Sequence, residues 1–310
     1  MGARVRGPKA SASDATETVL RLAVLLQAGM SPARAWSHLA ASGDTPAARV
    51  VASMDDGMPL ADAIVQAGAV QPSQRAPGAS DETARAWREV AAAWRVATTV
   101  GAPLAESLRG LATALRDAQE AADDVRVALA EPAGTARLMG WLPLVAVGLG
   151  AALGFDTFAV LLGQPLGLVC LAAGVALIVG AQRWTAALVR RARMEGGIAG
   201  LESELLAIAL SGGVSVERAI ALVRAAGVTA DPATEGVLAL SRSAGVPAVE
   251  LLRATSAFAR HRARIEGRLR AARLSSRLLL PLGVCTLPAF LFLGVAPMML
   301  SVMSTMPLSL

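Results

Sequence analysis

Side chains that commonly perform catalysis or bind metal ions are scarce in this sequence. Its 310 residues include two His, His38 and His261, and two Cys, Cys170 and Cys285. We expect each His on the surface of a helix, and each Cys lies in an apolar run without the spacing of a metal site or a disulfide framework. A Walker-type phosphate loop and a Ser-His-Asp candidate set are also absent from the sequence. The sequence therefore predicts no enzymatic activity, no cofactor and no metal site.

Neighbouring carboxylates are the nearest approach to a cation site. Asp55 and Asp56 are adjacent, and so are Asp123 and Asp124, with Glu120 one helical turn before them. Adjacent side chains on a helix point in different directions, so they do not surround one ion. We interpret these carboxylates as parts of solvated helix faces.

Arginine is concentrated in one segment, RHRARIEGRLRAARLSSR, which has seven Arg in the 18 residues from 260 to 277. The candidate contact residues in it are Arg260, Arg262, Arg264, Arg268, Arg270 and Arg273. Because an apolar run follows directly, the pattern favours contact with anionic lipid headgroups, at about 1 kcal/mol per basic residue. A docking face for an acidic partner is the alternative. Nucleic acid is not expected as a partner, because aromatic stacking residues are missing.

The string GAPLAESLR, residues 101 to 109, recurs as GVPAVELLR, residues 245 to 253, at a shift of 144 positions. The shared residues are Gly101, Pro103, Glu106, Leu108 and Arg109 in the first string and Gly245, Pro247, Glu250, Leu252 and Arg253 in the second. We interpret each string as a corner at which Gly ends one helix and Pro begins the next, with Glu near the positive N-terminal dipole and Leu on the packed face. A ligand-binding loop is the alternative, but a phosphate cradle would need several Gly amides and a Lys or Ser partner.

A second correspondence has a shift of 184 positions and links residues 19–43, VLRLAVLLQAGMSPARAWSHLAASG, with residues 205–227, LLAIALSGGVSVERAIALVRAAG. It places Gly29 on Gly213, Ser31 on Ser215, Ala35 on Ala219 and Gly43 on Gly227. Each copy predicts two short helices joined by a corner with a left-handed Gly and a Ser cap, and Pro32 suits the first turn of its helix. The first copy has 40 extra residues, which include GMPLADAIVQAG at 57–68. We interpret the pattern as an internal duplication.

Composition indicates a helical membrane protein. Apolar residues make up 54% of the chain and the mean hydropathy is +0.52, which is too hydrophobic for a pair of soluble domains. Tyr is absent, aromatic residues are 3%, and no long alternating run predicts a strand. Of the 29 Lys and Arg, 14 lie in residues 1–137 and 15 in residues 183–277. The stretches 138–182 and 278–310 have no basic residue, as a bilayer core requires.

We predict an all-α integral membrane protein with three transmembrane helices and two cytoplasmic helical bundles. The expected order is a disordered lead at 1–13, a first bundle at 14–137, a hairpin at 138–182 with spans 138–155 and 166–182, a second bundle at 183–277, a third span at 278–300 and a short extracytoplasmic tail at 301–310. Basic residues flank the hairpin, and the loop around Asp156 has none. The N-terminus and both bundles are therefore expected in the cytoplasm, and the C-terminus outside it.

These pieces resemble the type II secretion system F family of platform proteins, and within it the pilus-assembly members TadB and TadC. The resemblance rests on the Leu-rich helix that ends in AGMS or GGVS, the two Gly-x-Pro strings, GQPLG before the second span, and the final LLLPLGVCTLPAFLFLG. It extends over nearly the whole chain from about residue 14, and the second copy departs from the first in lacking the GMPLADAIVQAG block.

The resemblance implies a non-enzymatic platform in the cytoplasmic membrane. Such a protein would bind a hexameric assembly ATPase on its cytoplasmic side and pass motor movement to pilin-like subunits in the bilayer. The other implied partners are a second F-family protein or a further copy of the chain, and membrane lipids. The first bundle is expected to contribute at least part of the docking surface for the ATPase.

A permease subunit with three spans is the alternative function. A permease would place polar or ionisable groups inside its spans, whereas the spans here offer only Gly, Pro, Thr286 and Cys. A membrane-bound enzyme is a weaker alternative, because no set of acid, base or metal ligands assembles from these residues.

Overall fold

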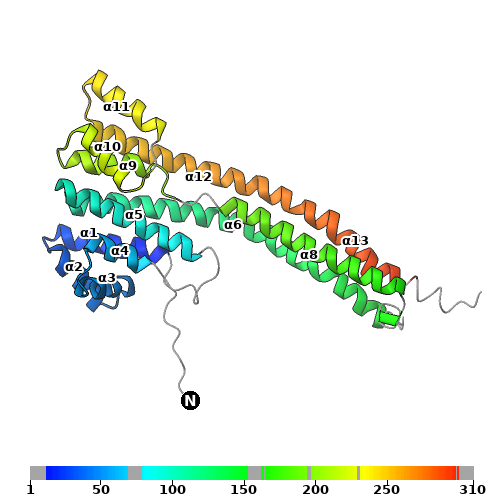
Figure 1. The fold of residues 1–310 in the computed structure, drawn as a ribbon. Coiled ribbons are helices and arrows are strands. Elements are labelled where there is room, and N and C mark those ends of the chain that lie inside the picture. The colour runs from blue at the N-terminus through cyan, green and yellow to red at the C-terminus, as the bar shows by residue number, and fades with distance from the viewer. Residues whose placement is uncertain are drawn as a thin grey trace, which may run out of the picture. The chain divides into compact units, whose positions relative to one another are not determined.

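The computed structural model describes residues 12–68, 79–152, 162–163, 165–193, 197–228, 231–297 and 299. All regular elements in these residues are helical, which confirms the predicted all-α class (Figure 1). The helices are α1 Ala12–Gln27, α2 Pro32–Ala41, α3 Thr45–Asp55, α4 Leu60–Gly68, α5 Ala79–Val100, α6 Leu104–Ala152, α8 Pro165–Arg193, α9 Leu201–Ser211, α10 Val216–Ala225, α11 Pro232–Ala244, α12 Ala248–Pro281 and α13 Leu287–Phe290, with π-helical segments η2 Leu282–Thr286 and η3 Leu291–Val295. Residues 1–11 of the predicted lead, the loop residue Asp156 and the predicted tail 301–310 lie outside the described residues.

Tertiary contacts divide the chain into two compact units. Unit 1 consists of residues 1–121 and 196–265, and unit 2 of residues 122–195 and 266–310. Residues of both predicted cytoplasmic bundles therefore belong to unit 1. The predicted hairpin and the third apolar run belong to unit 2. The units follow contacts in space, whereas the predicted domains follow chain order.

Unit 1 has one hydrophobic core to which both halves of the sequence contribute. Leu22 of α1 and Trp36 of α2 come from the first half, and Leu205 of α9 and Leu252 of α12 from the second; all four side chains are fully buried. Burying a Leu side chain stabilises a fold by roughly 1.5–3 kcal/mol, so neither half keeps its full stability without the other.

Tryptophans fill the part of this core that lies between α2 and α5. The ring centroids of Trp36 and Trp94 are 6.3 Å apart in a tilted arrangement, which is a favourable geometry for aromatic pairs. Trp87 and Trp94 are 1% and 3% exposed, so both lie in the core. A Cβ on Gly68 would lie 2.5 Å from Cβ of Trp87, so glycine permits the close approach of α4 to α5.

The two corners that the shift of 184 aligns have the same backbone conformation. Gly29 and Gly213 have φ of +87° and +81°, which matches the predicted left-handed corner. Pro32 begins α2, as expected. Ser215 caps α10 by accepting a hydrogen bond from the backbone N–H of Arg218 at 3.3 Å. Ser31 occupies the same N-cap position, but its hydroxyl accepts no capping hydrogen bond, which corrects that part of the prediction.

Helix α8 in unit 2 is long and apolar enough to cross a membrane, and it is the one such segment within the described residues. From Pro165 to Leu188 it has 24 residues with a mean hydropathy of 2.0. At about 1.5 Å per residue this length exceeds a hydrocarbon core of ~30 Å. Its exposed apolar side chains include Leu166, Val169 and Val175. The predicted span 166–182 lies inside this segment.

The other two predicted spans are helical where the structure describes them. Residues 138–152 form the C-terminal part of α6, and a shorter apolar helix, Gly283–Val295, lies within 278–300. Neither segment has the described length and composition of a span, so the count of three transmembrane helices stays a prediction.

Prolines widen the helix in the third apolar run. Segments η2 and η3 end at Thr286 and Val295, each two residues before a proline, Pro288 and Pro297. Proline lacks an N–H, and its ring displaces the carbonyl four residues earlier, so π-helical turns accommodate it. The prolines of this run are therefore accommodated by local π-helical turns.

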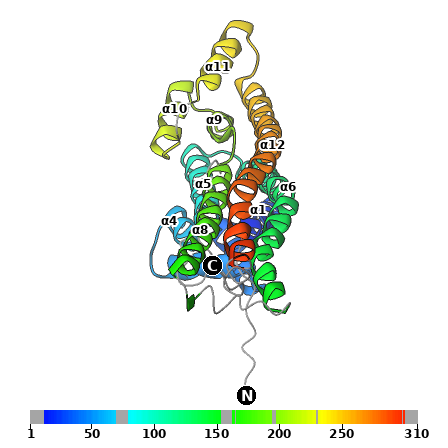
Figure 2. The same ribbon diagram turned by 90° about the vertical axis from the view of Figure 1, so that its right-hand side faces the viewer.

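Helix α8 packs directly against this widened helix. Figures 1 and 2 both show α8 and α13 side by side. A Cβ on Gly174 would lie 2.4 Å from Cγ of Leu293, which is 5% exposed. Small residues that let helices approach closely are typical of packing within membranes.

Candidate functional site

The two Gly-x-Pro strings lie at two helix corners of unit 1. Gly101 and Gly245 have φ of +71° and +67°, and α6 and α12 begin directly after Pro103 and Pro247. Leu108 and Leu252 are 1% and 0% exposed, so both lie on the packed face. The strings thus begin the two long helices, α6 and α12.

The two strings contact each other through an ion pair. Nη2 of Arg253 lies 2.6 Å from Oε1 of Glu106, and Nη1 of Arg253 lies 3.6 Å from Oε1 of Glu250. The equivalent Arg109 instead donates a hydrogen bond to Gln27 of α1. The contact is therefore not symmetric between the two copies.

A buried cluster follows one to two helical turns further along α12. The carboxylate of Glu204, on α9, is 8% exposed and accepts a hydrogen bond from Oγ of Ser256 at 2.7 Å. Arg260 is 12% exposed; its Nη1 lies 3.5 Å from the Glu204 carboxylate, and its Nε donates to Asp117 of α6 at 2.9 Å. A Cβ on Gly110 would lie 2.7 Å from Oε1 of Glu204, so glycine leaves room for the carboxylate.

More exposed ion pairs continue this line of contacts. Nη2 of Arg264 lies 2.9 Å from Glu120 and 3.5 Å from Asp117, and Nη2 of Arg268 lies 2.9 Å from Asp124. We call the acids of α6 together with the arginines of α12 the charged seam, which consists of Glu106, Asp117, Glu120, Asp124, Arg253, Arg260, Arg264 and Arg268. Each pair joins residues of the same unit, with Arg268 and Asp124 in unit 2 and the others in unit 1.

Burial divides the seam energetically. Exposed ion pairs contribute about 0–1 kcal/mol each and set the register of the helices more than their stability. Removing one partner of a buried pair costs about 3–5 kcal/mol, because the other charge is left without compensation. Arg260 of the seam also pairs with Glu204 of α9, and this buried pair is therefore the one on which the folding of unit 1 depends most.

The seam revises the interpretation of several charged residues. Glu120 and Asp124, expected on a solvated face, are 47% and 34% exposed and in addition form ion pairs with α12. Arg260, Arg264 and Arg268, expected to contact a partner or lipid, also pair within the chain. Contact of the arginine-rich segment with lipid or a partner stays a prediction. His38 and His261 are exposed on their helices, as expected.

One signal in the sequence could have indicated the seam. The shift of 144 that aligns the two strings also aligns Glu120 with Arg264 and Asp124 with Arg268. Opposite charges at positions related by the same shift as the two strings suggest that the two segments face each other. Glu204 and Ser256 give no such signal, because their contact depends on how α9 packs against α12.

Glu89 of α5 is a further charged residue at a junction of unit 1. Its Oε1 accepts a hydrogen bond from the backbone N–H of Ile198 at 3.3 Å, in the segment that leads into α9. Burial raises the pKa of Glu89 above its ordinary value of 4.5, while this hydrogen bond and the charges of Arg85 and Arg88 act in the opposite direction.

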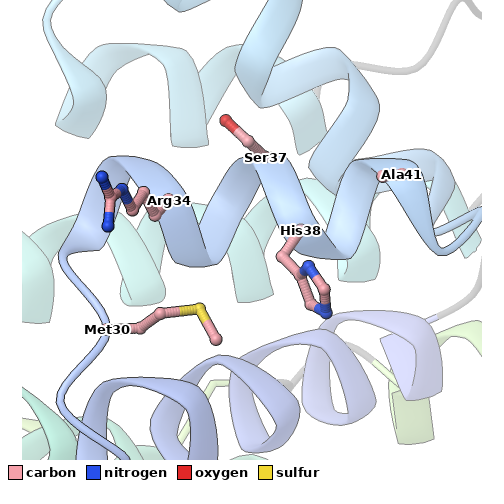
Figure 3. A pocket seen from close by; sticks show the side chains of 5 residues that line it. All are labelled: Met30, Arg34, Ser37, His38 and Ala41. Carbon is pink, nitrogen blue, oxygen red and sulfur yellow. The ribbon is translucent and has the colours of Figure 1, made fainter.

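An open pocket lies at the corner between α1 and α2 (Figure 3). It has a volume of about 430 Å³ and is lined by Met30, Arg34, Ser37, His38 and Ala41. In Figure 3, Met30 and His38 lie between α2 and α1, and Ser37 points away from α1. These groups do not form a catalytic or metal-binding set, and the described residues contain no cluster of three or more metal-ligating side chains.

Comparison with known families identifies part of the chain. The sequence model of the family described as type II secretion system (T2SS), protein F, matches residues 19–151. The match extends from α1 to nearly the end of α6, so it includes the first Gly-x-Pro string and most of the first apolar run. No curated protein matches the chain.

Proposed function

We propose that this chain is the platform of a Tad-type pilus assembly or secretion machine, because its residues 19–151 match the type II secretion system F family. The matched domain supports a membrane platform protein of the type II secretion or type IV pilus kind. Family members of this kind are platforms and not enzymes. Under the proposal, the chain couples a cytoplasmic assembly ATPase to pilin-like subunits and performs no chemistry itself.

The proposal places unit 2 in the cytoplasmic membrane with three spans. Its support is the apolar length of α8, the exposed apolar side chains of that helix and the absence of basic residues from 138–182 and 278–310. Lipid would cover these side chains, since exposing a continuous apolar face to water is unfavourable. Pilin-like subunits, which are membrane-bound before assembly, would contact these spans.

The proposal also includes an internal duplication. Its support is the equal backbone conformation at aligned glycines, for example Gly43 and Gly227, with φ of +92° and +84°. Ala35 and Ala219, also aligned, are both fully buried. One copy of the duplicated sequence would then bind the ATPase, while the other copy would complete the hydrophobic core of unit 1.

We place part of the ATPase-docking surface on α1 and α2. Leu20 and Val24 of α1 are 46% and 53% exposed, and the pocket with Arg34 lies at the end of the same helix. This face belongs to the residues that the family match covers. A second F-family protein or another copy of the chain, and membrane lipids, are the remaining proposed partners.

The test is capture of the assembly ATPase encoded near this protein by the full-length, detergent-solubilised chain. Arg34→Glu should weaken capture by about tenfold or more, because it reverses the charge beside the exposed apolar face. The matched control is Arg218→Glu, which changes the aligned Arg of the second half, also exposed, and should leave capture unchanged.

The result against the proposal is equally specific. Full-length protein that captures no ATPase at any salt concentration, and that changes the ion or solute permeability of liposomes, would support a permease subunit instead. If Arg34→Glu and Arg218→Glu weaken capture of the ATPase equally, α2 is not part of the docking surface.

A further inference from the structure

Two pairs of the charged seam, Glu120 with Arg264 and Asp124 with Arg268, join residues that are equivalent under the proposed internal duplication. Glu120 and Arg264 are 144 positions apart, and so are Asp124 and Arg268. Each of these pairs has an ion-pair distance of 2.9 Å. Within unit 1, the order of the pairs Glu106–Arg253, Asp117–Arg260 and Glu120–Arg264 shows that α6 and α12 run parallel there. The same place on the two helices therefore holds an acid in α6 and an arginine in α12.

We propose that this inversion of charge is a pairing code that lets α6 recognise α12 and excludes α6 of a second copy of the chain. If two α6 helices paired in the same geometry, Glu120 would face Glu120 and Asp124 would face Asp124. Like charges at facing positions are unfavourable, and such repulsion is how helices reject wrong partners. The inference goes beyond the platform function and does not depend on an ATPase.

The upper pairs of the seam do not carry this code. At the shift of 144, Arg116 is equivalent to Arg260 and Arg109 to Arg253. Two α6 helices would therefore still find an arginine opposite Asp117 and Glu106. Discrimination rests on the two lower pairs, which gives the proposal an internal control.

The order of synthesis explains why such a code would be needed. Residue 264 is made 144 residues after residue 120, and translation at about 5–20 residues per second takes roughly 7–29 s for that length. During this interval α6 exists without α12. Chains made side by side at one assembly site would bring incomplete copies together, and the code would keep their α6 helices apart.

The test uses single-cysteine cross-linking of the full chain in membranes. Cys170 and Cys285 are replaced by Ala, and Val125→Cys supplies the reporter on α6. Val125 lies close to α12, because a Cβ on Gly267 would be 3.4 Å from its Cγ2. A short bismaleimide then converts α6–α6 contact between copies into a covalent dimer.

Three variants of the charged seam are compared with the natural sequence. The first neutralises one pair, Glu120→Gln with Arg264→Gln. The second adds Asp124→Asn with Arg268→Gln, and the third instead adds the exchange Asp124→Arg with Arg268→Asp. We expect the second variant, in which both pairs are neutral, to give about tenfold more cross-linked dimer than the natural seam, equivalent to about 1.4 kcal/mol. The exchanged seam should fall back to the level of the first variant, since it again places like charges between copies.

Controls separate the code from general destabilisation. Glu106→Gln breaks an upper pair and should not raise the dimer. The double variant Val125→Cys with Gly267→Cys should form a cross-link within one chain for every seam, which shows that α6 still pairs with α12. If the fully neutral variant does not form the cross-link within one chain, the variant with one neutral pair is compared with the natural seam instead. We then expect a smaller rise in the amount of cross-linked dimer. The proposal is overturned if neutral seams that pass the check give no more dimer than the natural seam, or if the exchanged seam dimerises as much as the neutral one.

Discussion

At the scale of single residues, the buried arginine of the seam is the most constrained side chain. Arg260 is 12% exposed and contacts Glu204, Asp117 and Ser256. A guanidinium is always charged at physiological pH, so its burial depends on these acceptors. Asp117 is 33% exposed and can be hydrated without Arg260, whereas Glu204 is 8% exposed and cannot.

Replacing Arg260 with Met should therefore destabilise unit 1 by about 3–5 kcal/mol. The cost comes from leaving Glu204 charged and buried without its cation. Adding Glu204→Gln in the same chain should restore at least half of the loss, because the glutamine amide is neutral and can still accept from Ser256. Denaturant unfolding of the detergent-solubilised protein measures both variants. A double variant as unstable as Arg260→Met alone would argue that lost packing, not charge, causes the effect.

Glu89 makes stability depend on pH in a defined direction. Burial raises its pKa in the folded protein above 4.5, so the folded state binds the proton more tightly than the unfolded state does. The resulting stabilisation is present below pH 4.5 and is lost as the pH rises through the raised pKa. Glu89→Gln is neutral at every pH and keeps an acceptor for the N–H of Ile198. We expect it to be more stable than the natural protein at neutral pH and equal to it below pH 4.5, measured by urea unfolding. A variant less stable at neutral pH would show that the charged carboxylate is needed there.

At the scale of elements, glycine and proline decide how the helices of unit 2 pack. Proline widens the third apolar helix at η2 and η3, and Leu293 of η3 lies on Gly174 of α8. A glycine costs helix stability of roughly 1 kcal/mol relative to Ala, so its presence here indicates a requirement for close contact.

Gly174→Leu should disrupt this packing, because even a Cβ would lie 2.4 Å from Leu293. Overpacking typically costs about 1–3 kcal/mol. Gly180, exposed on the same helix and with no atom near its Cβ position, is the matched control, and Gly180→Leu should be tolerated. Thermal unfolding in detergent distinguishes the two. Equal melting temperatures would mean that α8 and η3 adjust freely.

At the scale of the whole chain, the shared core makes the two halves of unit 1 one folding unit. Leu252 belongs to the second half, whereas the buried tryptophans Trp36, Trp87 and Trp94 all belong to the first. Fragments that contain one half only are therefore not expected to keep this core. A destabilising substitution in the second half should therefore change the fluorescence of the tryptophans in the first half.

Leu252→Asp tests this coupling. An unpaired buried charge should cost more than about 4 kcal/mol, so tryptophan fluorescence should shift to longer wavelength although Leu252 lies far along the chain from every tryptophan of unit 1. Leu240→Asp is the control, since Leu240 is 54% exposed and its replacement should leave the spectrum unchanged. An unchanged spectrum in a Leu252→Asp chain whose helicity falls would show that the halves unfold independently.

Topology is the second property of the whole chain that can be tested. The proposed orientation follows from the distribution of basic residues. A reporter that is active only outside the cytoplasm should work when fused after Gln164 or Leu310 and fail after Ala130 or Ala230. Reporter activity after Ala230 would contradict the proposed orientation, and an inactive reporter after Gln164 would contradict the proposed hairpin.

The sequence by itself determined the helical class and the positions of several corners. Periodicity, the absence of alternating runs and the glycines at 29, 101, 213 and 245 act locally, because a left-handed corner depends on the residue that occupies it. The apolar stretch of α8 was predictable for the same reason, since length and composition alone make it a candidate span. Only the tertiary structure decided which halves share a core and which charges meet. Glu204, Ser256 and Arg260 come from α9 and α12, and Asp117 from α6, so their contact depends on packing between distant segments that no local pattern encodes. The ion pairs of Glu120 and Asp124 required both kinds of information: the sequence shift of 144 relates the opposite charges, and the packing of α6 against α12 brings each pair together.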